Sequence, residues 1–333
     1  MKKIREIIFA QAVRTGLLEE MRRDERVIVM GEDVGVYGSV YGVTKGLLRE
    51  FGPERVRDTP ISESAIAGMA VGAALVGLRP VVEIMYCDFL TQASDAIVNN
   101  AAKWRYMSGG QFKLPLVVRT PAGGATGYAA QHSQSLEAWM AHIPGLKVIM
   151  PSAPADARGL IKSAIRDDNP VVFIEHKTLY LHKGPVPAEE TLVPIGKGDI
   201  KREGADVTVV SWSEKVYYCL EAAERLAEDG ISVEVVDPRT LQPLDMDLIL
   251  ESVAKTGRLV VAHEAVTFGG FGAEIAAQVC ERAFEQLKAP PVRVGAKFAP
   301  IPFAEPMESY VMPQVGDIVA AVKQVVGEGA KVG

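Results

Sequence analysis

Two kinds of hydrophobic pattern alternate along the 333-residue chain. Short runs rich in β-branched residues predict strands, and longer stretches with apolar residues three or four positions apart predict helices. The strand-like runs of the first half are RVIVMG (26–31), RPVVEIMY (79–86), LPLVVRT (114–120), LKVIMP (146–151) and PVVFIE (170–175). Helices are predicted over 62–76, 89–106, 135–142 and 155–166, after an amphipathic first helix. Several strands are apolar on both faces, which is typical of a parallel sheet covered by helices.

The alternation stops between residues 181 and 206, where Pro, Gly and charged residues dominate, and then resumes. The later strands are DVTVVSW (206–212), ISVEVVD (231–237) and RLVVAHE (258–264), with helices over 214–228, 244–254 and 272–287. We therefore predict an α/β fold of two parallel-sheet domains, residues 1–185 and 207–328, joined by a linker over 186–206.

Composition and charge exclude several classes of partner. A formal net charge of -6, without any basic block, argues against nucleic acid or an anionic membrane as the main partner. No stretch approaches the ~20 apolar residues of a membrane span, and the N-terminal segment lacks the apolar core of a signal or transit peptide. The three cysteines are widely spaced, which predicts neither a disulfide framework nor a paired-cysteine zinc site, and favours reduced thiols and a cytoplasmic location.

One carboxylate stands out in the stretch DTPISESAIAGMAVGAALVG (58–77). Ser62 is a suitable N-cap, so Glu63 could be an ordinary first-turn carboxylate stabilised by the helix dipole. Three features favour chemistry instead. The helix is rich in glycine and alanine, which predicts close packing against another backbone. The stretch EIMYCDFLTQ (83–92) and the glycine-rich loop around His132 each follow a strand, and ligands of open α/β sheets bind at the carboxyl ends of strands.

His132, in AAQHSQS, is a candidate acid or base, because a loop histidine outside any apolar pattern is seldom a core residue. A purely structural role remains an equal alternative for it. Nucleotide binding is disfavoured: GEDVGVYGSVYG (31–42) lacks the lysine of a P-loop, and GGFGAEIAA (269–277) lacks the third glycine of the dinucleotide fingerprint. The sequence also has no G-x-S-x-G nucleophile motif and no H-E-x-x-H zinc motif.

Five ordered blocks then suggest a family: DTPISESAIAGMAVGAALVGLRPVVEIM, AAQHSQS, PGLKVIMPS, GLIKSAIRDDNPVVFIEHK and VVDPRTLQPLD. Together they resemble the beta subunit of the thiamine-diphosphate-dependent decarboxylase component of 2-oxo acid dehydrogenase complexes. Pyruvate, branched-chain 2-oxo acid and acetoin dehydrogenases share this subunit. The resemblance spans nearly the whole chain. It implies a pyrimidine-binding domain followed by a domain like the C-terminal domain of transketolase.

The resemblance implies roles for the candidate site residues. Glu63 matches the glutamate that hydrogen-bonds the aminopyrimidine N1′ of the cofactor and so favours the imino tautomer that removes the C2 proton. His132 matches the active-site histidine near the reacting carbon and the incoming lipoyl group. The residues that match the pyrimidine pocket are Ile61, Met85 and Phe89, with Gln92 nearby.

SAIRDDN, together with Leu116, resembles a monovalent-cation site, usually for potassium, built mostly from backbone carbonyls. Carbonyl oxygens are suitable ligands for hard cations. The alternative is an ordinary polar helix end before Pro170. The matching positions are Leu116, Ala164, Ile165, Asp167 and Asn169.

An absent motif points to a partner. Thiamine enzymes hold the diphosphate through Mg²⁺ with a GDG…N motif, whereas the GD pairs at 198–199 and 316–317 are both followed by isoleucine. The resemblance therefore implies an alpha subunit that supplies this half of the site in an α2β2 heterotetramer. It also implies docking to a dihydrolipoyl acyltransferase core with lipoyl and subunit-binding domains. Acidic residues of the second domain (Glu274, Glu281, Glu285) could contact a basic binding domain, although a solvated helix face is the favoured interpretation.

The implied activity is oxidative decarboxylation of a 2-oxo acid, with pyruvate as the first candidate, and reductive acylation of lipoyl-lysine, by a chain that is active only with its alpha subunit. Acetoin dehydrogenase and branched-chain 2-oxo acid dehydrogenase remain alternatives for the substrate. A non-catalytic assembly subunit is an alternative of another class, disfavoured because Glu63 and His132 both stand in their motifs.

Overall fold

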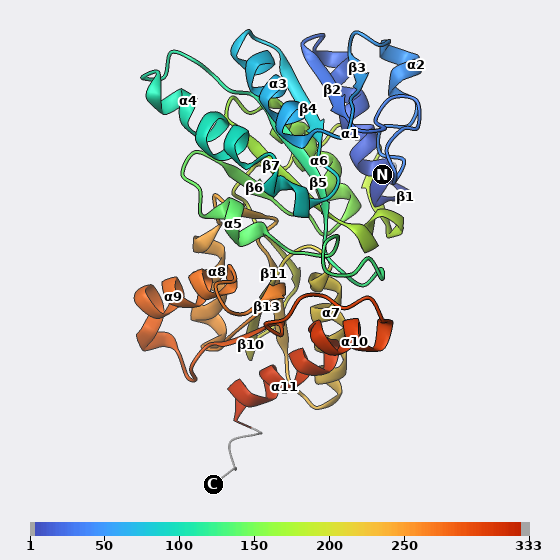
Figure 1. Cartoon of the computed structure of the whole chain (residues 1–333). Helices are drawn as coiled ribbons and strands as arrows, with labels where there is room; N and C mark the ends of the chain where they lie inside the picture. The colour runs from blue at the N-terminus through green and yellow to red at the C-terminus, as the bar shows by residue number, and fades with distance from the viewer. Residues whose placement is uncertain (1–3, 328–333) are drawn as a thin grey trace. The chain divides into compact units, whose positions relative to one another are not determined.

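The structure is a computed structural model of the whole chain, in which residues 4–327 are described (Figure 1). The chain forms two compact units. The first unit contains residues 4–122 and 139–195, and the second contains 123–138 and 196–327. The prediction of two α/β units is confirmed. The loop that carries His132 groups with the second unit although it lies in the first half of the sequence.

The first unit has a parallel sheet with the strand order β6-β7-β5-β4-β2-β3. Every residue of β2, β4, β5 and β7 is buried, which explains why these strands read as apolar on both faces. The strands are β2 (Val27–Gly31), β3 (Val56–Asp58), β4 (Arg79–Glu83), β5 (Val117–Ala122), β6 (Lys147–Ile149) and β7 (Val171–His176). A separate antiparallel pair joins β1 (Ile4–Ile8) to β8 (Lys183–Pro187).

Amphipathic helices cover this sheet. Helix α1 packs along α6, with Phe9, Val13, Leu17 and Met21 buried one turn apart. The helices are α1 (Phe9–Arg23), α2 (Leu47–Phe51), α3 (Glu63–Leu75), α4 (Ala102–Met107), α5 (Glu137–Ala141) and α6 (Pro154–Arg166). The helix predicted over 89–106 is divided into η1 (Cys87–Thr91), η2 (Asp95–Ala101) and α4, and η3 (Lys177–Leu181) follows β7. In η2 the side-chain amide of Asn100 donates to the carbonyl of Asp95 at 3.1 Å, which competes with regular helical bonding.

The second unit has a sheet with the strand order β14-β13-β10-β11-β9, in which only β9 is antiparallel to its neighbour. These strands are β9 (Asp199–Arg202), β10 (Val207–Ser211), β11 (Val233–Asp237), β13 (Leu259–Val266) and β14 (Val292–Ala296), and a short β12 (Thr240–Gln242) also belongs to the unit. The helices are α7 (Lys215–Glu228), α8 (Met246–Thr256), α9 (Gly272–Ala283), α10 (Glu305–Val311) and α11 (Val315–Val326), with η4 (Phe284–Gln286) after α9. Valines of β10, β11 and β13 form the core with the inner faces of α7 and α11.

The stretch expected to be a linker contains regular structure. Strand β9 lies within residues 186–206 and pairs with β11, and the later of the two segments of the second unit begins at Gly196 by its contacts. The sequence did not reveal β9 because its residues alternate neither in hydropathy nor in burial. The boundaries at 185 and 207 stay predictions.

One local expectation for α3 is wrong. Ser62 occupies the N-cap position, but its hydroxyl donates to the carbonyl of Pro60 at 3.1 Å instead of capping the helix. Close packing around the helix glycines is not found within the described residues, because a Cβ at Gly68 or Gly72 would meet nothing within 4 Å, so packing against another backbone stays a prediction. Among residues 4–327, none of the helices combines the length and the apolar character needed to cross a membrane.

Candidate functional site

Glu63 lies in the first turn of α3, a short distance after the carboxyl end of β3. The chain between them is fixed by Thr59, whose N–H donates to the carbonyl of Gly31 at 2.9 Å. Glu63 is half-buried, and among the described residues no hydrogen bond or ion pair to its carboxylate is found. The carboxylate is therefore available to a group from outside this chain.

Other carboxylates gather around Glu63 at the same edge of the sheet. Burial raises the pKa of Glu32, at the end of β2, and the negative charges of Asp33, Glu63 and Glu83 raise this pKa further. This influence on Glu32 requires that the other three carboxylates lie near it. The negative potential of this group favours a cationic or proton-sharing ligand.

The predicted pocket residues lie along one segment after β4. Met85 and Phe89 are half-buried, and Gln92 is exposed. Ser64, the residue after Glu63, donates from Oγ to the carbonyl of Gln92 at 2.5 Å, so the start of α3 and the end of this segment are in contact. Ile61 is 73% exposed and joins the group only through its nearness in sequence to Glu63.

A buried ion network lies beneath this edge. Arg119 of β5, 1% exposed, donates two hydrogen bonds of 2.7 Å to Glu175 of β7 and one of 2.5 Å to Glu83 of β4. Burial lowers the pKa of Arg119, but the charges of Glu175 and Glu83 outweigh it and raise this pKa above its ordinary value. Burial raises the pKa of Glu175, against the opposing effect of Arg119. Sequence reasoning missed this network, because its members come from three separate strands.

The same network reaches the β2–α2 loop (residues 32–46). Ser39 donates from Oγ to Glu83 at 2.6 Å. Asp58, the last residue of β3, accepts the N–H groups of Gly35 at 2.5 Å and Val36 at 3.1 Å. A glycine-rich loop that resembles a phosphate-binding loop in sequence is thus bound to carboxylates of its own chain, which disfavours a phosphate ligand there.

His132 belongs to the second unit, in the His132 loop (residues 123–136). It is half-buried, between the exposed Gln131 and the buried Ser133. Acidic side chains of the same unit contact the loop: Gly124 N–H donates to Glu264 at 2.8 Å, and Ala125 N–H donates to Glu308 at 2.8 Å. Neither glutamate was predicted from the sequence, because they lie 140 and 183 residues away along the chain.

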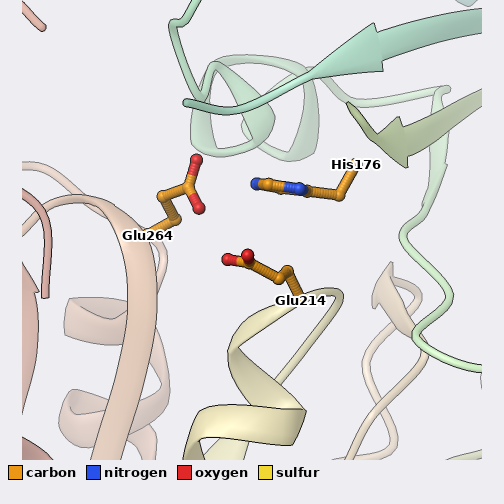
Figure 2. A group of neighbouring side chains, drawn as sticks. All are labelled: His176, Glu214 and Glu264. Atoms are coloured by element: carbon orange, nitrogen blue, oxygen red, sulfur yellow. The ribbon is translucent and has the colours of Figure 1, made fainter. Parts of the chain in front are cut away.

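Glu264 in turn contacts a buried lysine. Lys215 Nζ lies 2.7 Å from Glu214 Oε2 and 3.4 Å from Glu264 Oε2. Figure 2 shows the two carboxylates of this unit, Glu214 at the start of α7 and Glu264 on β13; the labelled His176 belongs to the first unit. Burial lowers the pKa of Lys215, but the charges of Glu264 and Glu214 outweigh it, and the pKa lies above its ordinary value.

A cavity of about 430 Å³ opens beside the His132 loop within the second unit. Its polar groups come from Ser133, Gln134, Ser135 and Glu264, and the Oγ of Ser133 has no hydrogen-bond partner among the described residues. The rest of its lining is apolar and consists of Ala130, Leu136, Ala265, Val266, Ala296, Phe298, Ala299, Pro300 and Ile301.

The predicted cation ligands all lie in the first unit, and Arg79 binds two of them. Arg79 of β4 donates to the carbonyls of Ile165 and Asp167, each at 2.7 Å, and the carbonyl of Leu116 accepts the N–H of Val171 at 2.8 Å. These carbonyls therefore already have one donor each, and a carbonyl oxygen keeps a second lone pair. The side-chain oxygen of Asn169 accepts from Arg105 at 2.7 Å, so the amide carbonyl of that side chain is also engaged.

Comparison with known proteins identifies the family. The family description "Transketolase, pyrimidine binding domain" matches residues 5–183, and "Transketolase, C-terminal domain" matches residues 196–318. The beta subunit of the pyruvate dehydrogenase E1 component of Rickettsia felis is 50% identical over 320 residues, which cover 96% of this chain and 98% of that protein. This chain is an E1 beta subunit of the 2-oxo acid dehydrogenase family. The predicted family and the predicted types of both domains are confirmed.

Two further relatives show how wide this E1 beta family is. The beta subunit of 2-oxoisovalerate dehydrogenase of Bacillus subtilis is 47% identical over 318 residues, which cover 95% of this chain and 97% of that protein. A solved structure described as "Split gene transketolase, inactive beta4 tetramer" matches with a TM-score of 0.77 and 26% identity, over 96% of this chain and 98% of that one. The fold is thus shared well beyond the E1 beta subunits.

Proposed function

We propose that this E1 beta subunit takes part in the oxidative decarboxylation of pyruvate and the reductive acylation of lipoyl-lysine, together with an alpha subunit in an α2β2 assembly. The observation that carries the proposal is Glu63: its motif matches the family glutamate, and its carboxylate stands half-buried at the start of α3, without a partner among residues 4–327. The relatives described as pyruvate dehydrogenase subunits support this substrate.

Thiamine diphosphate fits the residues around Glu63. A free carboxylate inside a negatively charged group suits a protonated ring nitrogen, and the half-buried Met85 and Phe89 offer an apolar contact for an aromatic ring. When bound, the cofactor would supply a carbon nucleophile and an electron sink for the decarboxylation of a 2-oxo acid.

Glu63 would hold a proton at the N1′ position of the aminopyrimidine, which favours the tautomer needed for proton removal. Met85 and Phe89 would pack against the ring, and Ile61 and Gln92 would lie at its border. His132 would transfer a proton or stabilise charge during acyl transfer to the lipoyl group. Each role is a proposal that the resemblance and the exposure of these side chains support.

The proposed alpha subunit would bring the diphosphate and Mg²⁺ half of the site. The face of α3 supports such a partner, because Gly68 and Gly72 have open space above them and Met69 is 50% exposed. Small residues permit close approach of another backbone, so the close packing expected for this helix would occur between chains. An acyltransferase core with lipoyl and subunit-binding domains would then bind the assembled E1.

The decisive experiment replaces Glu63 by glutamine in the reconstituted α/β assembly. The glutamine side chain keeps the shape of glutamate but cannot share a proton in the same way, so turnover should fall at least 100-fold, by about 2.7 kcal/mol of transition-state stabilisation. The matched control is Glu54→Gln, an exposed glutamate of the same unit, which should retain full activity. Near-normal turnover of E63Q, with the cofactor bound, would contradict the role of Glu63.

Two substitutions test the alternative of a non-catalytic assembly subunit. Met85→Ala and Phe89→Ala should weaken thiamine diphosphate binding by the assembly, which equilibrium titration measures. Unchanged affinity in both variants, with intact α2β2, would favour the assembly subunit instead.

A branched-chain substrate is a second candidate, supported by the 2-oxoisovalerate dehydrogenase relative. Acetoin is the remaining alternative. Initial rates of the assembly with pyruvate, 2-oxoisovalerate and acetoin would rank the three, and pyruvate should give the highest kcat/KM. A location in the cytoplasm stays a prediction, since a similar rice protein is described as mitochondrial.

We also propose a potassium ion at the carbonyls of Leu116, Ala164, Ile165 and Asp167, with Asn169 beside them, which would use their second lone pairs. The approach of two of these carbonyls, those of Ile165 and Asp167, to Arg79 supports the proposal. Replacing K⁺ by the larger tetramethylammonium ion at constant ionic strength should lower the unfolding temperature of the assembly. An unchanged unfolding temperature would reject the site.

A further inference from the structure

The His132 loop has a backbone that is unfavourable without outside support. Four of its residues, Gly123, Ala125, Gly127 and Ala129, have positive φ angles of 88°, 62°, 69° and 59°. An alanine in this region is strained by its Cβ. A loop with two such alanines keeps one conformation only where other groups bind it firmly.

Two buried carboxylates of the same unit provide this binding. Glu264 accepts the N–H of Gly124 at 2.8 Å, and Glu308 accepts the N–H of Ala125 at 2.8 Å and of Gly127 at 3.3 Å. The exposed fractions of Glu264 and Glu308 are only 7% and 4%. Hydrogen bonds from N–H groups to ionised, water-shielded carboxylates are stronger than bonds between neutral groups.

The His132 loop approaches Glu308 and Met312 closely at Gly124. A Cβ at this position would lie 2.6 Å from Sδ of Met312 and 3.1 Å from Oε1 of Glu308, so only glycine allows the approach. On the far side of the loop, the N–H of Gly123 donates to the carbonyl of Gln134 at 3.1 Å, and Ser135 Oγ lies 3.4 Å from Glu264. The two ends of the segment that carries His132 are thus tied to one another and to the glutamates.

We propose that Glu264 and Glu308 are positioning residues that hold the His132 loop, and thereby His132, in the conformation required for acyl transfer to the lipoyl group. The inference rests on the role of His132 proposed above. Glu264 is itself fixed by Lys215, whereas Glu308 stands on α10 and binds the strained Ala125 directly. Glu308 is therefore the better residue to test, because its loss leaves the Lys215 ion pairs intact.

The experiment compares Glu308→Gln with His132→Ala in the α/β assembly, using two assays. One measures decarboxylation with an artificial electron acceptor, and the other measures acylation of a lipoyl domain. Both variants should lose at least 10-fold in the lipoyl assay and less than 3-fold in the artificial-acceptor assay. The double variant should be no slower than His132→Ala alone, because a loop that has lost His132 gains nothing from being positioned.

Hydrogen exchange gives a readout that does not depend on activity. The amides of residues 124–127 should exchange at least 10-fold faster in E308Q, while the core strands β10 and β13 stay protected. Gly124→Ala disturbs the same contact without removing a charge and should reproduce both effects. Glu305→Gln, an exposed neighbour on the same helix, is the matched control and should leave exchange and both rates unchanged.

Equal losses of E308Q in both assays, or full additivity with His132→Ala, would overturn the inference. Unchanged exchange at residues 124–127 would do the same. Failure of the proposed function gives a different result, since the wild-type assembly would then turn over none of the 2-oxo acids while the exchange experiment still reports whether Glu308 holds the loop.

Discussion

Two glycine-rich loops of this chain are held by carboxylates, but by carboxylates of different kinds. The β2–α2 loop binds Asp58, which is exposed and lies on the neighbouring strand β3. The His132 loop binds Glu264 and Glu308, which are buried and come from the other end of the chain. In both loops a glycine lies directly beside the carboxylate: a Cβ at Gly35 would be 2.7 Å from Asp58, and one at Gly124 would be 3.1 Å from Glu308.

A carboxylate that accepts the N–H groups of a glycine-rich loop thus has a different effect when it is exposed than when it is buried. An exposed carboxylate exchanges its bonds readily with water, so the β2–α2 loop owes more of its order to the buried network behind it, through Ser39 and Glu83. The glutamates of the second unit are only 7% and 4% exposed, so water competes less for their hydrogen bonds, and the loop they hold carries a candidate acid or base. Firm binding is therefore found in the loop that carries the proposed acid or base.

The largest effect should come from the network behind the β2–α2 loop. Arg119→Met would leave Glu83 and Glu175 buried without their cation, and breaking such a group typically costs about 3–5 kcal/mol. Chemical unfolding of the variant should show this loss, and hydrogen exchange should increase in residues 32–46. Arg57→Met, at an exposed ion pair, is the control and should change stability by less than about 0.5 kcal/mol. A small loss of stability for Arg119→Met would mean that the hydrogen bond between Ser39 and Glu83 does not order the β2–α2 loop.

The stability of the second unit, whose Glu264 and Glu308 bind the His132 loop, should depend on pH. His263 precedes Glu264 on β13 and stacks on Trp212 with ring centroids 5.2 Å apart. Burial, helped by the charge of Arg293, lowers the pKa of His263 to about 4. Since the unfolded chain binds this proton near pH 6.5 and the folded chain does not, stability should fall as the pH falls from about 6.5 to about 4, by up to roughly 3 kcal/mol.

Unfolding midpoints measured between pH 7 and pH 4 test this dependence on His263. In His263→Asn the additional loss of stability over this range should disappear, even if the variant is less stable at pH 7. His142→Asn, an exposed histidine of the first unit, should keep the wild-type profile. A profile of His263→Asn parallel to that of the wild type would exclude the buried histidine as the cause.

The Arg119 network and the glutamates that bind the His132 loop also show what the sequence could and could not predict. The strands and helices around both loops follow from hydrophobic periodicity, and β2, β4, α3 and β13 lie within a few residues of their predicted bounds. Glu63 and His132 were found through motifs, because their neighbours in sequence carry the signal. Glu264, Glu308 and Arg119 carry no such signal, since their partners are distant in sequence. The Ser62 cap was mispredicted because its hydroxyl has a competing carbonyl acceptor at Pro60.

A smaller effect is expected when the exposed carboxylate is changed. In Asp58→Asn one acceptor oxygen remains, but the side-chain NH₂ group faces the other backbone N–H. The free energy of unfolding should therefore fall by about 1 kcal/mol, well below the loss for Arg119→Met. Exchange should increase at Gly35 and Val36 only. Asp247→Asn, an exposed residue of the second unit, is the control. A loss larger than that of Arg119→Met would reverse the order of the two supports and make Asp58 the main anchor.

An effect of similar size to that of Asp58→Asn is expected at a glycine that needs conformation more than space. Gly42 in the β2–α2 loop has a φ of 73°, and a Cβ there would meet nothing within 4 Å. Gly42→Ala should therefore cost about 1 kcal/mol of left-handed strain, and Gly42→Asn less, because asparagine adopts this region more readily. Gly124→Ala in the His132 loop should cost more than Gly42→Ala, because the added Cβ would push Met312 and Glu308 away from the loop. Chemical unfolding measures both costs. Equal costs for the two alanines would mean that the His132 loop moves aside freely, which its buried glutamates should not allow.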